Sequence, residues 1–130
     1  QEDKKVERDY QHSLFGELME AQNRIKKNQE FNRLYKRSKR YYNKNFRILV
    51  SNNGRDYPRF GFTVTRKYGK ANKRNKIRRR LKEIIRLNMD IFENKDYIIA
   101  PNFQTIDMDY KDLEKSLKHV IAISKRHIDE

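Results

Sequence analysis

The chain has 130 residues, which fits one compact domain, and its 32 Lys and Arg outnumber 18 Asp and Glu to give a formal net charge of +14. It has no cysteine, which excludes a disulfide framework, a thiolate metal site and a cysteine nucleophile, and no apolar run approaches the ~20 residues that span a bilayer. We therefore expect a cytoplasmic protein that binds a polyanion and does not enter a membrane.

The first 23 residues form an acidic segment, with 6 acidic and 3 basic side chains. Apolar residues recur every four positions from Val6 to Leu18, a helical spacing that Gly16 interrupts. We therefore predict an acidic N-terminal extension over 1–23, with a helix over 6–18, and a folded domain over 24–130.

A second helical pattern begins near Asn28. This asparagine is a good N-cap, and Glu30 stands in the first turn, where the helix dipole favours a negative charge. Phe31, Leu34 and Tyr35 then form a stripe at i, i+3 and i+4. The pattern predicts an amphipathic helix whose apolar side packs on the rest of the domain.

Three strands are predicted next. Residues 39–42 are short and aromatic, which is typical of an edge strand, and residues 45–51 place Phe46, Ile48 and Val50 on one strongly apolar face. A turn at 52–54 then leads to residues 59–65, which place aromatic and β-branched residues on one face. We expect this third strand to run antiparallel to the second.

A basic helix follows the loop around Gly69. Ile77, Leu81, Ile84 and Ile85 recur at helical spacing, with Asn88 at the next position of the same stripe, and this stripe must face the sheet. The basic side chains on its other faces are expected near solvent: Arg74, Arg78, Arg79, Lys82 and Arg86. The helix should therefore present a cationic ridge.

The C-terminal part adds one strand and one helix. Residues 97–100 are a continuous apolar run before Pro101, as expected for a strand covered on both faces. Asp109 then resembles an N-cap, with Asp112 at the third helical position. The stripe of this helix that is expected to face the core comprises Tyr110, Leu113, Leu117, Val120, Ile121 and Ser124. The element order is α-β-β-β-α-β-α, an α+β fold.

Residues for catalysis or metal binding do not cluster in the sequence. His12, His119 and His127 lie near the chain ends, and no further His or Cys stands at i+3 or i+4 from any of them, so we interpret them as surface histidines. The carboxylates over 107–114 are an alternative magnesium site, but helix capping explains two of them more simply. We predict neither a catalytic residue nor a metal site.

The positive charge is concentrated in two blocks. Residues 24–47 carry 10 basic and 1 acidic side chains, and residues 66–86 carry 11 and 1. Such focused charge attracts the phosphates of nucleic acid. Phe31 and Tyr35 add rings that either stack on unpaired bases or pack in the core. Nucleic acid is therefore the expected polyanion.

The basic helix also carries a recognisable motif. Residues 71–82, Ala-Asn-Lys-Arg-Asn-Lys-Ile-Arg-Arg-Arg-Leu-Lys, resemble the signature of the bacterial ribonuclease P protein family, an Arg-Asn-Arg run followed by further basic residues. Three other pieces match the family in the same order, at 24–35, 61–69 and 97–117. The resemblance therefore extends over most of the chain.

The resemblance implies a fold and a role. The fold is an αβββαβα sandwich, a four-stranded mixed sheet packed by helices, with a left-handed βαβ crossover through the basic helix. The role is that of protein subunit of ribonuclease P, which removes the 5′ leader of precursor tRNA. The implied partners are the catalytic RNA and precursor tRNA, with no membrane and no small-molecule substrate. The RNA, and not the protein, is expected to hold the Mg²⁺ ions that cleave.

The resemblance also assigns two groups of residues. Contact with the catalytic RNA is implied for Arg74, Asn75, Lys76, Arg78, Arg79, Lys82 and Arg86. A cleft between the first helix and the sheet, which holds the 5′ leader, is implied for Phe31, Tyr35, Thr63, Arg66 and Lys67.

Two other functions use part of the same pattern. A general RNA-binding or ribosome-associated protein would use the charges and rings without a cleavage partner, and it would not prefer leader-bearing precursor tRNA over mature tRNA. A protein nuclease would need acid–base or metal-binding residues, which we do not find in the sequence.

Overall fold

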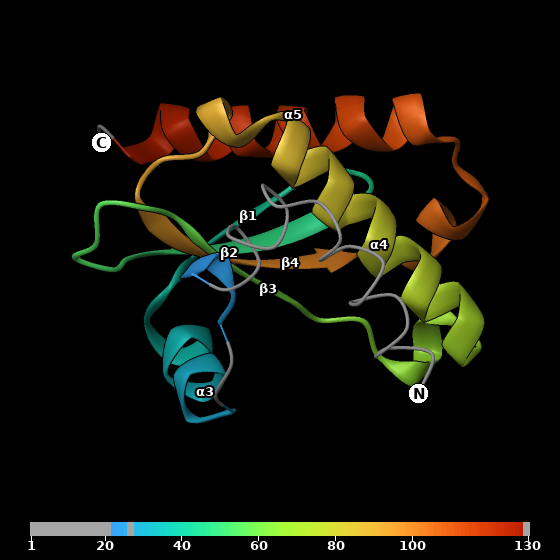
Figure 1. The fold of residues 1–130 in the computed structure, drawn as a ribbon, viewed down its shortest axis with the longest axis horizontal. Helices are drawn as coiled ribbons and strands as arrows, with labels where there is room; N and C mark the ends of the chain where they lie inside the picture. Colours follow the sequence, from blue (N-terminus) through green and yellow to red (C-terminus); the bar gives the residue numbers. More distant parts are fainter. Residues whose placement is uncertain (1–21, 26–27, 129–130) are drawn as a thin grey trace.

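The computed structural model describes residues 22–25 and 28–128, and within them the elements follow the predicted order (Figure 1). The helices and strands are α3 (Asn28–Arg37), β1 (Lys39–Tyr42), β2 (Phe46–Asn52), β3 (Arg59–Phe62), α4 (Ala71–Leu87), β4 (Lys95–Pro101) and α5 (Tyr110–Ile128). The 3-10 turns are η1 (Arg66–Tyr68), η2 (Met89–Ile91) and η3 (Phe103–Asp107). The α+β class is confirmed, while the predicted helix over 6–18 lies outside the described residues.

The four strands form one mixed sheet in the order β1-β2-β4-β3. β2 pairs antiparallel with β1 and with β4, and β3 pairs parallel with β4. The connection from β3 through α4 to β4 is the predicted βαβ crossover. β1 lies at one edge of the sheet, as its short aromatic sequence indicated.

The third strand is shorter than predicted, and it does not pair with β2, although it runs in the predicted direction. It ends at Phe62, although the Thr63 N–H still donates to the Ile99 carbonyl at 3.0 Å before the chain turns into η1. Its direction is antiparallel to β2, but β4 lies between them. The reason is that β4 is buried along Asp96–Ile99, and a buried strand needs hydrogen-bonding partners on both sides.

The two faces of the sheet are covered by different helices. α4 and α5 lie on one face and α3 lies on the other (Figure 1). Since strand side chains alternate, Ile48 and Ile99 join the main core under α4 and α5. Leu49 and Ile98 point the opposite way, into a smaller core with Leu34 of α3.

The chain is tied to β3 before α3 begins. The Asn23 side chain is buried and donates to the Pro58 carbonyl, and the Ile25 N–H donates to the Phe60 carbonyl at 2.9 Å. The packed fold therefore includes Asn23, one residue before the predicted boundary at 24. The N-cap role predicted for Asn28 lies outside the described side chains.

The start of α5 matches its prediction. The Asp109 carboxylate accepts a hydrogen bond from the Asp112 N–H at 2.8 Å, which is N-cap geometry. The buried stripe is also as predicted, with Leu113, Leu117 and Val120 inside the main core. Capping therefore accounts for Asp109, as the sequence indicated.

Asp109→Ala is expected to lower the free energy of unfolding by about 1 kcal/mol, because it removes the acceptor for a helix N-terminal N–H. Chemical unfolding followed by circular dichroism measures the change. Asp107→Ala is the matched control, since it removes the same charge from an exposed side chain two residues earlier. Equal losses in both variants would contradict the capping role.

Candidate nucleic-acid interface

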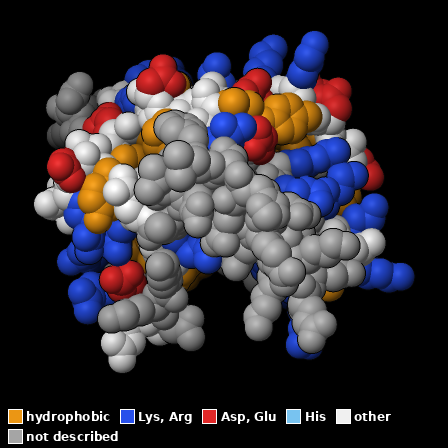
Figure 2. All heavy atoms as spheres, in the orientation of Figure 1, with side chains coloured by type: hydrophobic (Ala, Val, Ile, Leu, Met, Phe, Trp, Pro, Cys, Tyr) orange, Lys and Arg blue, Asp and Glu red, His pale blue; other side chains and the backbone are white. Residues whose placement is uncertain are grey.

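α4 is amphipathic in the way that the sequence predicted. Ile77, Leu81, Ile84 and Ile85 are buried against the sheet, and basic side chains occupy the rest of the helix surface. Figure 2 shows Lys and Arg side chains gathered on the side of the molecule where α4 lies. The apolar stripe separates two rows of cations, one along each of its borders.

We call Arg74, Arg78 and Lys82 the first flank of α4. All three are half-buried, so they lie closer to the domain than the predicted solvent-facing ridge. Arg78 shows the reason, since its guanidinium donates to the Asn75 side-chain oxygen at 3.2 Å and lies 3.5 Å from the Val64 carbonyl. This flank is therefore held along the border with the chain that leaves β3.

The outermost face of α4 carries Arg79 and Arg86. Arg79 is exposed, as predicted. Arg86 is half-buried and pairs with Glu83 one turn earlier, its Nε donating to Oε2 at 3.1 Å. Such an i, i+3 ion pair partly neutralises Arg86, so Arg79 is the more available cation of the two.

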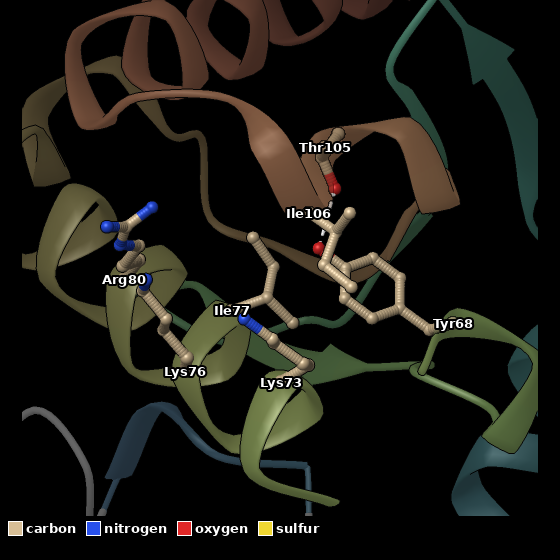
Figure 3. Close-up of a pocket in the computed structure, with 7 residues that line it drawn as sticks. All are labelled: Tyr68, Lys73, Lys76, Ile77, Arg80, Thr105 and Ile106. Carbon is tan, nitrogen blue, oxygen red and sulfur yellow. Dashed lines mark hydrogen bonds between the residues drawn. The ribbon is translucent and has the colours of Figure 1, made fainter. Parts of the chain in front are cut away.

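We call Lys73, Lys76 and Arg80 the second flank of α4. They project beside Ile77 and border a small hollow opposite Tyr68 (Figure 3). Lys73 and Lys76 are exposed, whereas Arg80 donates to the Met108 carbonyl at 3.2 Å. The sequence assigned only Lys76 to the interface. The i, i+3, i+7 spacing of these cations is the signal that would have found the other two.

The base of that hollow is tied to the interior by a hydrogen bond. The Tyr68 hydroxyl is 2.9 Å from the Thr105 hydroxyl in the interior, and burial is the main cause of the raised pKa of Tyr68 (Figure 3). This hydrogen bond joins η1, which precedes α4, to η3, which follows β4. The N-terminal end of α4 is thus fixed against two connecting turns.

Phe31 and Tyr35, two of the residues predicted for the leader cleft, lie on α3, on the other face of the sheet. Phe31 and Tyr35 are partly buried against the smaller core. Phe31 sits directly on Gly61, where a Cβ would come within 2.4 Å of the phenyl ring. The Tyr35 hydroxyl is hydrogen-bonded to the Thr63 hydroxyl. The structure therefore brings together three of the five residues predicted for the cleft, and both rings pack against the smaller core.

α3 is held in place by an ion-pair network. The Arg59 guanidinium binds both Asp96 oxygens, at 2.9 and 2.7 Å, and its Nη1 lies 3.3 Å from the Glu30 carboxylate of α3. Asn53 donates to Asp96 at 3.0 Å. The hydrogen bond with Asp96 is the main cause of the raised pKa of Arg59, so this arginine stays charged.

An open hollow of about 300 Å³ begins at Thr63, the hydrogen-bond partner of Tyr35. It shares Thr63 and Lys67 with the predicted cleft, and Arg66 on η1 is exposed without lining it. Arg47 of β2 and Phe103 of η3 also line it, and the sequence did not assign them. Arg47 belongs to this face because it stands two residues before Leu49 on β2, and Leu49 points into the smaller core under α3.

Other site types find little support among the described residues. These residues hold no group of three His, Cys, Asp or Glu side chains that would suit a metal ion, and none of their helices is long and apolar enough to cross a membrane. His119 is exposed, with Nδ1 3.1 Å from the Asn43 amide nitrogen. The side chains of His12 and His127 lie outside the described residues.

Comparison with known proteins gives one consistent family. The family model described as Ribonuclease P matches residues 19–125. The ribonuclease P protein component of Finegoldia magna is 47% identical over 103 residues, which cover 78% of this chain and 90% of that protein.

Solved structures agree with this match. A Staphylococcus aureus RNase P protein mutant, described as defective in mRNA degradation activity, gives a TM-score of 0.79 at 36% identity, covering 87% of this chain and 97% of that one. The RNase P protein from Thermotoga maritima gives 0.71 at 30% identity, covering 75% and 94%. The resemblance predicted from the sequence is confirmed.

Proposed function

Since the chain belongs to the ribonuclease P protein family and is a component of that tRNA-processing endoribonuclease, we propose that its two faces bind two different RNAs. The cationic surface of α4 contacts the catalytic RNA. The cleft under α3 holds the 5′ leader of precursor tRNA. The protein acts in the cytoplasm, where its lack of cysteine suits a reducing environment.

One observation carries this proposal: the rings and the cationic helix lie on opposite faces of the sheet (Figure 1). Phosphate contacts by Lys and Arg position a protein on structured RNA, while aromatic rings stack on unpaired bases. A leader is single-stranded, and a folded RNA presents mainly backbone. The two surfaces therefore suit two strands bound at the same time.

The protein's part in the reaction is to bind and orient. The cations of α4 join the protein to the catalytic RNA, and the cleft fixes the leader relative to the cleavage site. Mg²⁺ held by the RNA supplies the cleavage chemistry. Holding the leader raises the effective concentration of substrate and improves its orientation, which lowers the barrier without a catalytic side chain.

Adding the protein to a bacterial ribonuclease P RNA at low magnesium is expected to restore cleavage of precursor tRNA at the mature 5′ end. The complex is also expected to bind precursor tRNA at least about 10-fold more tightly than mature tRNA, because each stacked leader base contributes ~1–3 kcal/mol. Gel analysis of cleavage and filter binding measure the two effects.

The result depends on a matching RNA subunit, so RNAs from two structural classes serve as the control. Cleavage stimulated with either RNA supports the proposal. Binding to both RNAs with no stimulation, and with equal affinity for precursor and mature tRNA, would favour a general RNA-binding protein instead.

A further inference from the structure

The hollow at the end of the cleft contains an exposed aromatic ring. We propose that Phe103, Arg47 and Lys67 form a stacking subsite for one unpaired nucleotide of the leader. The inference rests on the proposed function, because it takes the strand held in the cleft as the occupant.

Phe103 is unusual among the large apolar side chains of the described structure. It is 69% exposed, whereas Phe46, Phe60 and Phe92 are buried in the main core. A single exposed apolar residue needs no explanation by itself. The position of Phe103 does need an explanation, because its ring lines a hollow that two cations, Arg47 and Lys67, also line.

The backbone that carries this ring is fixed on both sides. The Asn102 N–H donates to the Asn45 carbonyl at 2.8 Å, and the Gln104 side chain donates to the Lys44 carbonyl at 2.6 Å. The Thr105 hydroxyl donates back to the Asn102 carbonyl at 2.7 Å. A ring presented from a fixed turn loses little conformational entropy when it binds, which favours affinity.

The charges of the hollow suit a nucleotide. Arg47 approaches from β2 and Lys67 from η1, both exposed, and the described lining residues include no carboxylate. The hydroxyls of Thr63 and Thr65 add hydrogen-bonding groups. A ring for the base and cations for its flanking phosphates are the two parts of a single-strand site. The volume of about 300 Å³ lies at the lower end of ligand pockets.

The hollow also continues the cleft. Thr63 lines it and is hydrogen-bonded to Tyr35 of α3, so the two regions share a wall. A strand stacked on Phe31 and Tyr35 can therefore extend along the sheet to Phe103. The subsite would contact a leader nucleotide further along the strand than the nucleotides bound under α3.

The test measures binding of precursor tRNAs whose leaders grow by one nucleotide at a time. The wild-type protein with its catalytic RNA is expected to gain affinity at the length that reaches Phe103. Phe103→Ala should abolish this step, weakening binding of longer leaders by about 5-fold to 100-fold and leaving shorter leaders unchanged. Phe103→Tyr should retain the step because it keeps the ring, and Phe103→Leu should lose it.

An abasic nucleotide at the same leader position tests whether Phe103 contacts the base itself. It should weaken binding to the wild-type protein as much as Phe103→Ala does, and it should add no further loss in that variant. Leu87→Ala is the control, since it truncates another exposed apolar side chain at the far end of α4, 56% exposed. It should leave the length dependence unchanged.

Two outcomes overturn the subsite. One is an unchanged affinity step in Phe103→Ala, and the other is an equal loss for every leader length and for mature tRNA. Either result would contradict the subsite at Phe103 without contradicting the proposed leader-binding cleft. Wild-type protein that shows no dependence on leader length would instead overturn the proposed function.

Discussion

Asp96→Ala is expected to lower the free energy of unfolding by about 3–5 kcal/mol, a large part of the stability of a small domain. The carboxylate is 3% exposed and takes a bidentate pair from Arg59, whose side chain is 13% exposed. Removing it leaves a mostly buried guanidinium without its main partner. The Asn53 amide loses an acceptor as well.

Chemical unfolding measures this loss, and a double replacement shows its cause. Arg59→Met combined with Asp96→Leu removes both charges, so it is expected to recover most of the lost stability. A double variant as unstable as Asp96→Ala would show that shape, and not charge, sets the contribution of the pair. The same variants also test whether this ion-pair network positions α3 at the proposed cleft, because Arg59 is paired with Glu30 of α3.

The element order and the cores follow closely from the sequence. The stripes of α4 and α5 have a period of 3.6 residues, and residues 97–100 form a continuous apolar run, of which Tyr97, Ile98 and Ile99 are buried. Both patterns are local, so they fix which side of each element is buried. The prediction that Asp109 is an N-cap was also correct, because it too depends only on neighbouring residues.

The pairing of the third strand was not predictable in this way. Nothing within residues 59–65 indicates that its neighbour is a strand more than 30 residues later. The choice depends on β4 taking the centre of the sheet, which is a property of the whole fold. Gly61 is a related case, since its close contact with Phe31 becomes visible only once α3 is placed over β3.

The residues of the candidate site also divide into those that a local sequence pattern indicates and those that only the fold brings together. The motif residues of α4 could be chosen as candidates from the sequence because they are contiguous, although the half-buried position of Arg78 depends on the distant Val64 carbonyl. Arg47 and Phe103 were missed because they come from β2 and η3 and meet only in the folded hollow. An isolated Phe in a loop carries no signal in the sequence.

Removing three exposed cations from α4 is expected to weaken binding of the catalytic RNA by at least about 100-fold. Lys73, Lys76 and Arg79 are exposed, so replacing all three with alanine should preserve the fold. Hydrogen bonds to charged groups contribute ~1.5–3 kcal/mol each. The slope of log K against log salt concentration should also fall by about 2 to 3, because fewer counterions are released.

A matched triple variant on α5 separates the position of the charges from their number. Lys111, Lys115 and Lys118 are also exposed, and replacing them with alanine removes the same three charges. Filter binding across a salt series is expected to show a small, uniform loss for this variant, because these lysines lie on another helix and act only through the net field. Equal losses in the two triple variants would mean that α4 is no special binding surface and that net charge alone attracts the RNA. A loss confined to the α4 variant would assign the contact to that helix, since both proteins carry the same total charge.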